Sequence, residues 1–434
     1  MEYMISRSVQ KYVALVGIDW ADRKHVGKLL DLLTGEVETV ELAQKPEAIQ
    51  AWANKLRARY QTGTIAIALE QSRGPLMYAL MRYDLFDLYP VNPMTMASFR
   101  KAWATSGAKD DPTDADLLLQ LLAQHSDKLR CWKADDPTTH KLTLLCEKRR
   151  KVVDLRTRLS NGLKAVLKEY FPQALEIMGD NLTGAMGCDF LLKWPTFQEL
   201  QRARESTVQA FFYQHNSRSA QLMRKRLDLI RDGVTLTDDS AVLEASAMMA
   251  TALVKQLRQL VHSIRQFDVK IDALYKQHED HFIFDSLPGS GPCLGPRILT
   301  VFGLDRERWD DASDVQKFTG IAPVMERSGK TVVVHKRYAC PKFARQTFHE
   351  FAGRSKSFSV WAKAYYDQQR DRGNGHHAAV RSLAFKWQRI IFRCWKKRVP
   401  YDEAKYLQAL QRSGSELLDY ITGKRQPIWP KKAA

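Results

Sequence analysis

The segment "KYVALVGID", residues 11–19, is a near-continuous apolar run that ends in an acid. Such a run is typical of a strand that is buried on both faces of a sheet. Two further strand-like segments follow it, "HVGKLLDLL" (25–33) and "VETVEL" (37–42), and the turn residues "TGE" separate them. A short polar turn between two such segments is typical of a hairpin. We therefore predict that the fold begins with a three-stranded hairpin meander.

After the meander, helical and strand-like segments alternate. Helical spacing covers 46–60 and begins at Pro46, and "TIAIALE" (64–70) is another buried strand that ends in an acid. The order βββ-α-β-α-β-α predicts an α/β domain with a mixed sheet and covering helices. The later members of the series are a helix at 74–84, a strand at 85–91 and a helix at 93–103.

From about residue 139 to 280 the pattern becomes helical. Residues 141–171 form a long, charged, amphipathic segment, and a looser helical insert occupies about 175–245. An apolar seam then repeats at spacings of 4 and 3 over three heptads, which is typical of a coiled coil. A long helix packed within its own chain would give the same pattern. The seam consists of Leu253, Leu257, Leu260, Ile264, Phe267, Ile271 and Leu274.

The C-terminal part begins with the glycine-rich turn "DSLPGSGPCLGPRILTVFG" (285–303), which leads into a helix. "PVMERSGKTVVVHKR" (323–337) predicts a strand, a Ser-Gly turn and a second strand. The remainder to about 412 has helical, basic character. At 434 residues the chain has room for several domains. We predict an α/β domain at 1–128, a helical and coiled-coil region at 129–280, a mostly helical domain at 281–412 and a tail at 413–434.

The net charge of +18 is concentrated in one region. Residues 321–400 contain 18 Lys or Arg and 4 Asp or Glu, a net +14 that leaves +4 for the rest. A basic block with interleaved aromatics favours a polyanionic partner such as nucleic acid, although a solvated basic face would look similar. The aromatics are Phe343, Phe348, Phe358, Trp361, Tyr365, Tyr366, Trp387 and Trp395.

The six cysteines lie far apart and form no CxxC pair, which indicates neither a disulfide framework nor a zinc site. There is no signal-peptide core and no apolar run of membrane-spanning length. We expect a soluble cytoplasmic protein without a membrane partner.

Acids gather where the predicted elements of the first domain begin and end. Asp19 and Glu70 each end a buried strand, and "GAKDDPTDADLL" (107–118) places Asp111 and Asp114 at the start of a helix. Clustered carboxylates repel one another unless a cation neutralises them, and hard divalent ions prefer oxygen ligands. The four acids therefore predict a Mg²⁺ (or Mn²⁺) site, although strand ends and helix capping also explain each acid singly. Asp110 and Asp116 are neighbours that the pattern does not exclude.

Several motifs together resemble a known transposase family. "VGIDW", "ALEQSRG", "VNP" and "GAKDDPTDADLL" in the first part, and "SLPGSGP", "FTGIAPVMERSGKTV", "AYYDQQRDRG" and "PYDEAKY" in the last, are similar to the insertion-sequence one-ten (IS110) family. Its relatives include the Piv and MooV DNA invertases. The resemblance spans nearly the whole chain and is weakest at about 175–245. It implies an RNase H-like (RuvC-like) DEDD catalytic domain, a coiled-coil linker and a smaller second domain.

The resemblance also implies a chemistry and a set of partners. It implies recombination of donor and target DNA under the guidance of a structured bridge RNA. The family's nucleophilic serine corresponds to Ser328 in "ERSGK", whereas the residues alone leave Ser286 and Ser290 equally open. The resemblance makes the neighbouring cations candidate DNA contacts, namely Arg327, Lys330, Lys336 and Arg337. Ser328 is more than two hundred positions from the acids, and the 253–274 seam is regular enough to pair with another chain, which predicts composite sites in a dimer or a pair of dimers. We expect a bacterial or archaeal protein associated with the nucleoid.

Three other functions fit part of the pattern. A RuvC-like nuclease would need the acids but not Ser328, and a Piv-type invertase would use the same machinery as a transposase. A non-catalytic nucleic-acid-binding protein would bind without metal and would break no strand.

Overall fold

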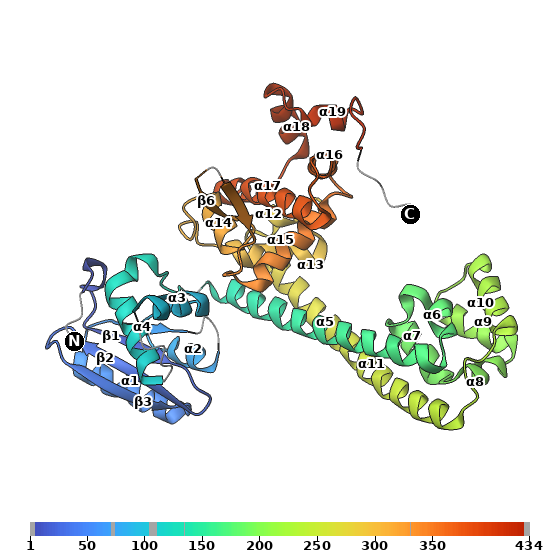
Figure 1. Cartoon of the computed structure of the whole chain (residues 1–434), viewed down its shortest axis with the longest axis horizontal. Helices are drawn as coiled ribbons and strands as arrows, with labels where there is room; N and C mark the ends of the chain where they lie inside the picture. The colour runs from blue at the N-terminus through green and yellow to red at the C-terminus, as the bar shows by residue number, and fades with distance from the viewer. Residues whose placement is uncertain (1–4, 71–73, 104–110, 134, 330, 429–434) are drawn as a thin grey trace. The chain divides into compact units, whose positions relative to one another are not determined.

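The computed structural model describes residues 5–70, 74–103, 111–133, 135–329 and 331–428, and these form two compact units, Met1–Ala134 and Asp135–Ala434 (Figure 1). The first unit is built on a five-stranded sheet, and the described part of the second is almost entirely helical apart from one two-stranded ribbon. The predicted combination of an α/β domain with a helical remainder is confirmed.

The sheet of the first unit has the strand order β3-β2-β1-β4-β5. β2 pairs antiparallel with both β1 and β3, and this is the predicted meander. β4 lies parallel to β1 and to β5, so the sheet is mixed, as predicted. The bounds are Ala14–Asp19 for β1, Lys24–Asp31 for β2, Val37–Ala43 for β3, Ile65–Leu69 for β4 and Phe86–Pro90 for β5.

Helices cover both faces of this sheet. Val16 and Ile18 of β1 pack in one core with α1 (Pro46–Tyr60) and α2 (Pro75–Leu80). Leu15 faces the other way, into a second core with α3 (Pro93–Trp103) and α4 (Asp111–His125). Burial on both faces explains why β4 and all of β1 before Asp19 lack polar side chains, since neither face of these segments meets water.

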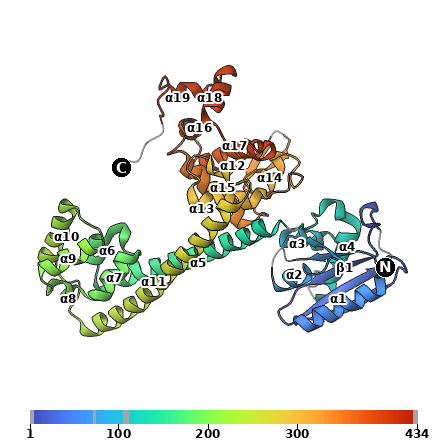
Figure 2. The ribbon, with the colours of Figure 1, turned by 180° about the vertical axis from the view of Figure 1, so that it is seen from behind.

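The second unit contains a long antiparallel pair of helices, α5 (Pro137–Tyr170) and α11 (Ser240–Gln277), which lie side by side in Figures 1 and 2. Arg149 of α5 pairs with Asp268 of α11, and Thr139 pairs with His278 just beyond it. Four residues of the predicted seam are buried in this unit, namely Leu253, Leu257, Ile264 and Ile271. The heptad pattern therefore describes a helix packed within its own chain, the second of the two interpretations of the sequence.

The insert at 175–245 is a compact helical lobe with a core of its own. Aromatic side chains such as Phe171, Phe190 and Phe212 fill this core, together with residues from the adjoining ends of α5 and α11. The irregular sequence pattern reflects short helices, each of which contributes only a few apolar residues. These helices are α6 (Gln173–Met178), α7 (Ala185–Lys193), α8 (Phe197–Gln201), α9 (Glu205–Gln214) and α10 (Ala220–Asp232).

The C-terminal helices surround four buried tryptophans, Trp309, Trp361, Trp387 and Trp395. The helices are α12 (His281–Asp285), α13 (Gly291–Phe302), α14 (Ala312–Phe318), α15 (Lys342–Ser355), α16 (Val360–Asp371), α17 (His376–Lys397), α18 (Glu403–Arg412) and α19 (Leu417–Ile421). The expected tail at 413–434 is wrong in its first part, because Leu417 of α19 is 2% exposed and packs in this core.

The aromatics of the basic block belong mostly to the same core. Phe348, Trp361, Trp387 and Trp395 are completely buried, while Phe358 is 55% exposed. Their interpretation as part of a nucleic-acid surface is therefore wrong for most of them. A helix that alternates basic and aromatic residues turns its aromatic stripe inward and its charges to water.

In the described part of the chain, no helix combines the length and the apolar character that crossing a bilayer requires. All six cysteines are free thiols.

Burial of His278 makes the stability of the second unit depend on pH. Nδ1 of this buried ring accepts a hydrogen bond from the Asp280 N–H, and Nε2 lies 2.8 Å from Thr139 Oγ1. Desolvation lowers the pKa of His278 below its usual value of 6.5. Below that pH the unfolded chain binds more protons than the folded chain, so the free energy of unfolding decreases as the pH falls.

We expect the melting temperature of the second unit to decrease by several degrees between about pH 7.5 and pH 5.5, measured by calorimetry. His278→Asn should show a smaller decrease, since it removes one titrating group. Burial also lowers the pKa of His349, so part of the decrease should remain in this variant. An equal or larger decrease in His278→Asn would show that this ring does not titrate as described.

Candidate active site

Asp19 and Glu70 lie at matching ends of two neighbouring parallel strands. Ile18 of β1 is the register partner of Leu69 of β4, so the next residues along each strand are Asp19 and Glu70. Leu15 of β1 faces the core that α4 covers. Because side chains alternate along a strand, Asp19 projects to that same face. Glu70 directly follows the last residue of β4. Both acids are half-buried. The strand register thus brings the two positions to the same end of the sheet, and a shared site formed by both acids stays a prediction.

Helix α4 brings its N-terminus to the same end of the sheet. Ser6 donates its N–H to the carbonyl of Ala123, so the C-terminal end of α4 lies beside the residues that precede β1. The helix therefore runs antiparallel to β1, with its first residue, Asp111, toward the carboxyl end of that strand. The approach is close, since a Cβ on Gly17 would lie 2.3 Å from the carbonyl oxygen of Ala115.

The remaining acids of "GAKDDPTDADLL" differ in their surroundings. Asp114 is 4% exposed, and its Oδ1 accepts hydrogen bonds from Nε (2.9 Å) and Nη2 (2.5 Å) of Arg100. Asp116 accepts a hydrogen bond from Gln120 one turn further along α4. The side chain of Asp111 and the whole of Asp110 lie outside the described residues. Among the side chains that the structure does describe, no three acids, histidines or cysteines are close enough together to hold a metal ion.

The donor set nevertheless has the chemistry that a divalent ion requires. Asp19, Glu70 and Asp114 offer only carboxylate oxygens, which Mg²⁺ and Mn²⁺ accept readily. The buried carboxylate of Asp114 already needs a cation beside it, and Arg100 supplies one here. Sequence analysis missed Arg100, although a cation in the last turn of the helix that precedes the acids was the available signal.

Substitution of Arg100 tests how much this guanidinium stabilises the Asp114 carboxylate when no metal is bound. Arg100→Ala should lower the free energy of unfolding of the first unit by about 3 kcal/mol, because it leaves the buried Asp114 carboxylate without its partner. Urea denaturation followed by tryptophan fluorescence measures the loss. Mg²⁺ should restore more stability to this variant than to the wild type, because the ion can replace the lost positive charge. An equal response of both proteins to Mg²⁺ would argue against Asp114 as a ligand.

Ser328 lies at the tip of an exposed two-stranded ribbon in the second unit. It is the last residue of β6 (Val324–Ser328), and its register partner Thr331 begins β7 (Thr331–His335). Gly329, in the connecting turn, has a φ of +57°, which a glycine adopts without strain. Within the described residues, no hydrogen bond holds the Ser328 hydroxyl, and the side chain is exposed.

The two alternative serines are engaged in the fold. Ser286 Oγ donates to the carbonyl of Ile283 and accepts from the Tyr401 N–H. Ser290 is 4% exposed and donates to the carbonyl of Leu287. Each hydroxyl completes the backbone hydrogen bonding of the glycine-rich turn, which favours Ser328 as the serine that is available to a substrate.

The cations beside Ser328 have different positions. Arg327 is exposed on the ribbon, and Lys336 is exposed with its Nζ 5.7 Å from the centre of the Tyr338 ring. Arg337 is half-buried and donates to the carbonyl of Ala322 at the base of the ribbon, so its contact is structural. Lys330 lies outside the described residues.

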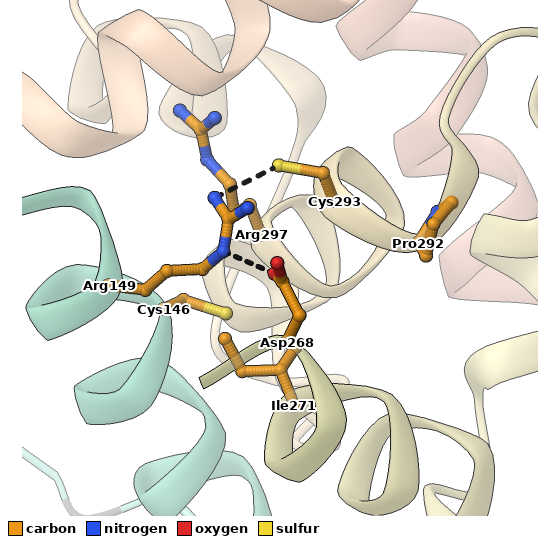
Figure 3. A pocket seen from close by; sticks show the side chains of 7 residues that line it. All are labelled: Cys146, Arg149, Asp268, Ile271, Pro292, Cys293 and Arg297. Carbon is orange, nitrogen blue, oxygen red and sulfur yellow. Dashed lines mark hydrogen bonds and ion pairs between the residues drawn. The ribbon is translucent and has the colours of Figure 1, made fainter. Parts of the chain in front are cut away.

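A small pocket in the second unit is a structural junction. Arg149 of α5 donates to Asp268 of α11 and to the sulfur of Cys293 on α13, and thereby joins three helices (Figure 3). Arg297 lines the same pocket and pairs with Glu350 of α15. The Arg149–Cys293 hydrogen bond and an ion pair between Arg150 of α5 and Glu350 join the α5–α11 pair to the C-terminal helices.

Comparison with known proteins gives consistent matches. Residues 16–172 match a DEDD-type family model described as "Transposase", and residues 282–367 match the "Transposase IS116/IS110/IS902 family". A putative mini-circle transposase for IS117 from Streptomyces coelicolor is 26% identical over 92% of this chain and 98% of its own length. A putative transposase from Sinorhizobium fredii is 29% identical over 46% of this chain and 56% of its own. An uncharacterised IS110 protein from Streptomyces coelicolor is 22% identical over 87% and 92%.

Proposed function

Because the chain belongs to the IS110 family of transposases, enzymes that cut and rejoin DNA, we propose that it does so through a serine–DNA intermediate formed beside a metal-binding acid cluster. The acids of the proposal are Asp19, Glu70, Asp111 and Asp114, and the nucleophile is Ser328. The proposed fold of residues 1–128 is RuvC-like.

One observation carries the acid part of the proposal. β1 and β4 end side by side in acids, and the N-terminus of α4 is directed toward the same end of the sheet. A divalent ion bound to these oxygens would polarise a phosphate and stabilise the leaving oxygen. Arg100 supports the same site by compensating Asp114 when no ion is bound.

The serine step conserves the energy of the DNA backbone. Oγ of Ser328 attacks the phosphorus, and the bond from phosphorus to one deoxyribose oxygen breaks. The proton of the serine leaves as the new bond forms, and the released oxygen takes up a proton. The phosphoserine diester that results retains an activated phosphate, so reversal of the step joins a new DNA end without an external energy source. Arg327, Lys330 and Lys336 are proposed to neutralise the nearby phosphates.

The proposed partners are donor DNA, target DNA and a structured guide RNA. The concentration of positive charge in 321–400 supports binding of polyanions by the second unit. The four acids belong to one compact unit and Ser328 to the other, and this division suits an active site assembled from two chains. We propose a dimer, or a pair of dimers, in which each site combines the acids of one subunit with Ser328 of another.

Removal of RNA tests the guided mechanism. Recombination of a plasmid that carries both DNA sites should cease after thorough ribonuclease treatment, and it should return when RNA transcribed from the flanking DNA is added. Because phosphate contacts dominate such binding, the affinity for that RNA should fall steeply with salt. An RNA of equal length and scrambled sequence is the control. Recombination at the full rate after RNA removal would refute the guided mechanism but leave the serine chemistry standing.

A further inference from the structure

The ribbon that carries Ser328 has two faces of different chemistry. Directly opposed residues share a face, and the register pairs Met325 with Val334 and Arg327 with Val332. These four side chains therefore form one face, which we call the apolar face. Ser328 and Thr331 lie on the opposite face, together with the ion pair between Glu326 and His335 (3.2 Å).

The apolar face is open to solvent. Met325 is 60% exposed, Val332 51% and Val334 62%. An isolated two-stranded ribbon is only marginally stable in water, and exposed apolar side chains on such a ribbon generally mark a surface that another molecule covers. The opposite face carries two hydroxyls and the Glu326–His335 ion pair, so contact through the apolar face is the one that removes more apolar surface from water.

The base of the ribbon is held firmly. Gly320 has a φ of +68°, and a Cβ at this position would lie 2.2 Å from the sulfur of Cys340. Arg345 donates to the carbonyl of Arg337 and to the same sulfur. These contacts join the two chain segments that enter and leave the ribbon. The tip therefore projects from a fixed base, and its two-residue turn makes it narrow.

Charge identifies the kind of molecule that covers the apolar face. Residues 324–345 contain six Lys or Arg and one acid, a net +5, and the single acid, Glu326, is paired with His335. This net positive charge repels a basic protein surface and attracts a polyanion. Two strands about 4.8 Å apart, with their side chains, match the roughly 12 Å width of the major groove of B-DNA, whereas the minor groove, about 6 Å wide, is too narrow.

We propose that the β6–β7 ribbon enters the major groove of duplex DNA with its apolar face against the base edges, so that the opposite face, which carries Ser328, is directed out of the groove. Met325, Val332 and Val334 suit the methyl groups of thymine, and Arg327 on the same face suits the two acceptors of guanine. The ribbon thus contributes to the choice of DNA sequence beside the cut. This inference depends on the DNA-cutting function of the chain but not on Ser328 as the nucleophile.

The test is a methylation-protection experiment with the full chain and the RNA that copurifies with it, on a duplex that carries the end of its own element. Dimethyl sulfate attacks guanine N7 in the major groove, so the bound ribbon should protect one or a few guanines. The double variant Met325→Ser, Val334→Ser should lose this protection and bind about tenfold more weakly. Val333→Ser places a single Val-to-Ser substitution on the opposite face and should retain both protection and affinity within about twofold. Melting temperatures equal to that of the wild type establish that each variant is folded.

Several outcomes would overturn the proposal. The first is unchanged guanine protection in the double variant. The second is loss of binding in Val333→Ser equal to that in the double variant. The third is competition by distamycin, a minor-groove ligand, without any major-groove protection. Ser328→Ala separates this inference from the catalytic one, because it should keep the protection pattern while losing cleavage. The apolar face would belong to a different partner if the protein protected only an RNA–DNA hybrid. The same would follow if it protected only a second protein chain, against proteolysis. Either result would refute the proposed contact with duplex DNA.

Discussion

Asp19→Asn should lower the rate of strand exchange by about a hundredfold or more while leaving the fold intact. The amide has nearly the shape of the carboxylate but lacks the charge that holds a divalent ion. The side chain is half-buried at the end of β1, beyond the apolar core, so the melting temperature of the first unit should change little in the absence of metal. The measurement is recombination of a plasmid substrate at a series of Mg²⁺ and Mn²⁺ concentrations.

A matched control lies on α4. Asp116→Asn makes the same chemical change in the same acidic segment, but Asp116 is engaged with Gln120 along the helix. This variant should retain activity within about threefold, because an amide in place of the half-buried carboxylate can still accept the hydrogen bond from Gln120. Glu70→Gln should behave like Asp19→Asn, because the strand register places the two acids together. Wild-type activity of Asp19→Asn at low Mg²⁺ would exclude Asp19 as a metal ligand. Loss of activity in Asp116→Asn would indicate that Asp116 of α4 belongs to the metal site.

Ser328→Ala should abolish the covalent protein–DNA species, since the methyl group cannot attack phosphorus. The substitution is at an exposed ribbon tip, so folding and DNA binding should be unaffected. The measurement is recovery of protein-linked DNA after denaturation, with an end-labelled substrate. Ser290→Ala is the control, because the hydroxyl it removes is engaged with the carbonyl of Leu287. It should still form the covalent species, at the cost of about 1 kcal/mol in stability.

Mixing variants tests whether two chains share a site. Ser328→Ala and Asp19→Asn should each be inactive alone, and mixed oligomers of the two should recover part of the activity, because some sites receive both intact halves. The absence of recovery in oligomers shown to be mixed would place the complete site within one chain. Covalent capture of DNA by Ser328→Ala would remove Ser328 as the nucleophile altogether.

Local sequence pattern was sufficient to predict the order of strands and helices in the first unit. The apolar runs of β1 and β4, the turn "TGE" and the helical spacing over 46–60 each depend on neighbours close in sequence, and each appears in the structure where it was predicted. The adjacency of Asp19 and Glu70 also followed from pattern, since parallel neighbours with acids at their carboxyl ends meet at one sheet edge. The role of Ser328 came from family resemblance, because a Ser-Gly pair has no local signature beyond a turn.

The tertiary structure was needed wherever the same sequence pattern is compatible with two different environments. The heptads of 253–274 suit any apolar partner, and only the position of α5 in space shows that the partner is in the same chain. Sequence alone does not show that the aromatics of the basic block are buried in a core. Aromatic residues have the same helical spacing and the same basic neighbours in a core as on a binding surface. Sequence alone does not distinguish Ser286, Ser290 and Ser328. In the structure Ser286 accepts a hydrogen bond from the Tyr401 N–H, 115 residues away, Ser290 is buried, and Ser328 is exposed. The Arg100–Asp114 pair likewise joins two helices through a contact that depends on how both pack against the sheet.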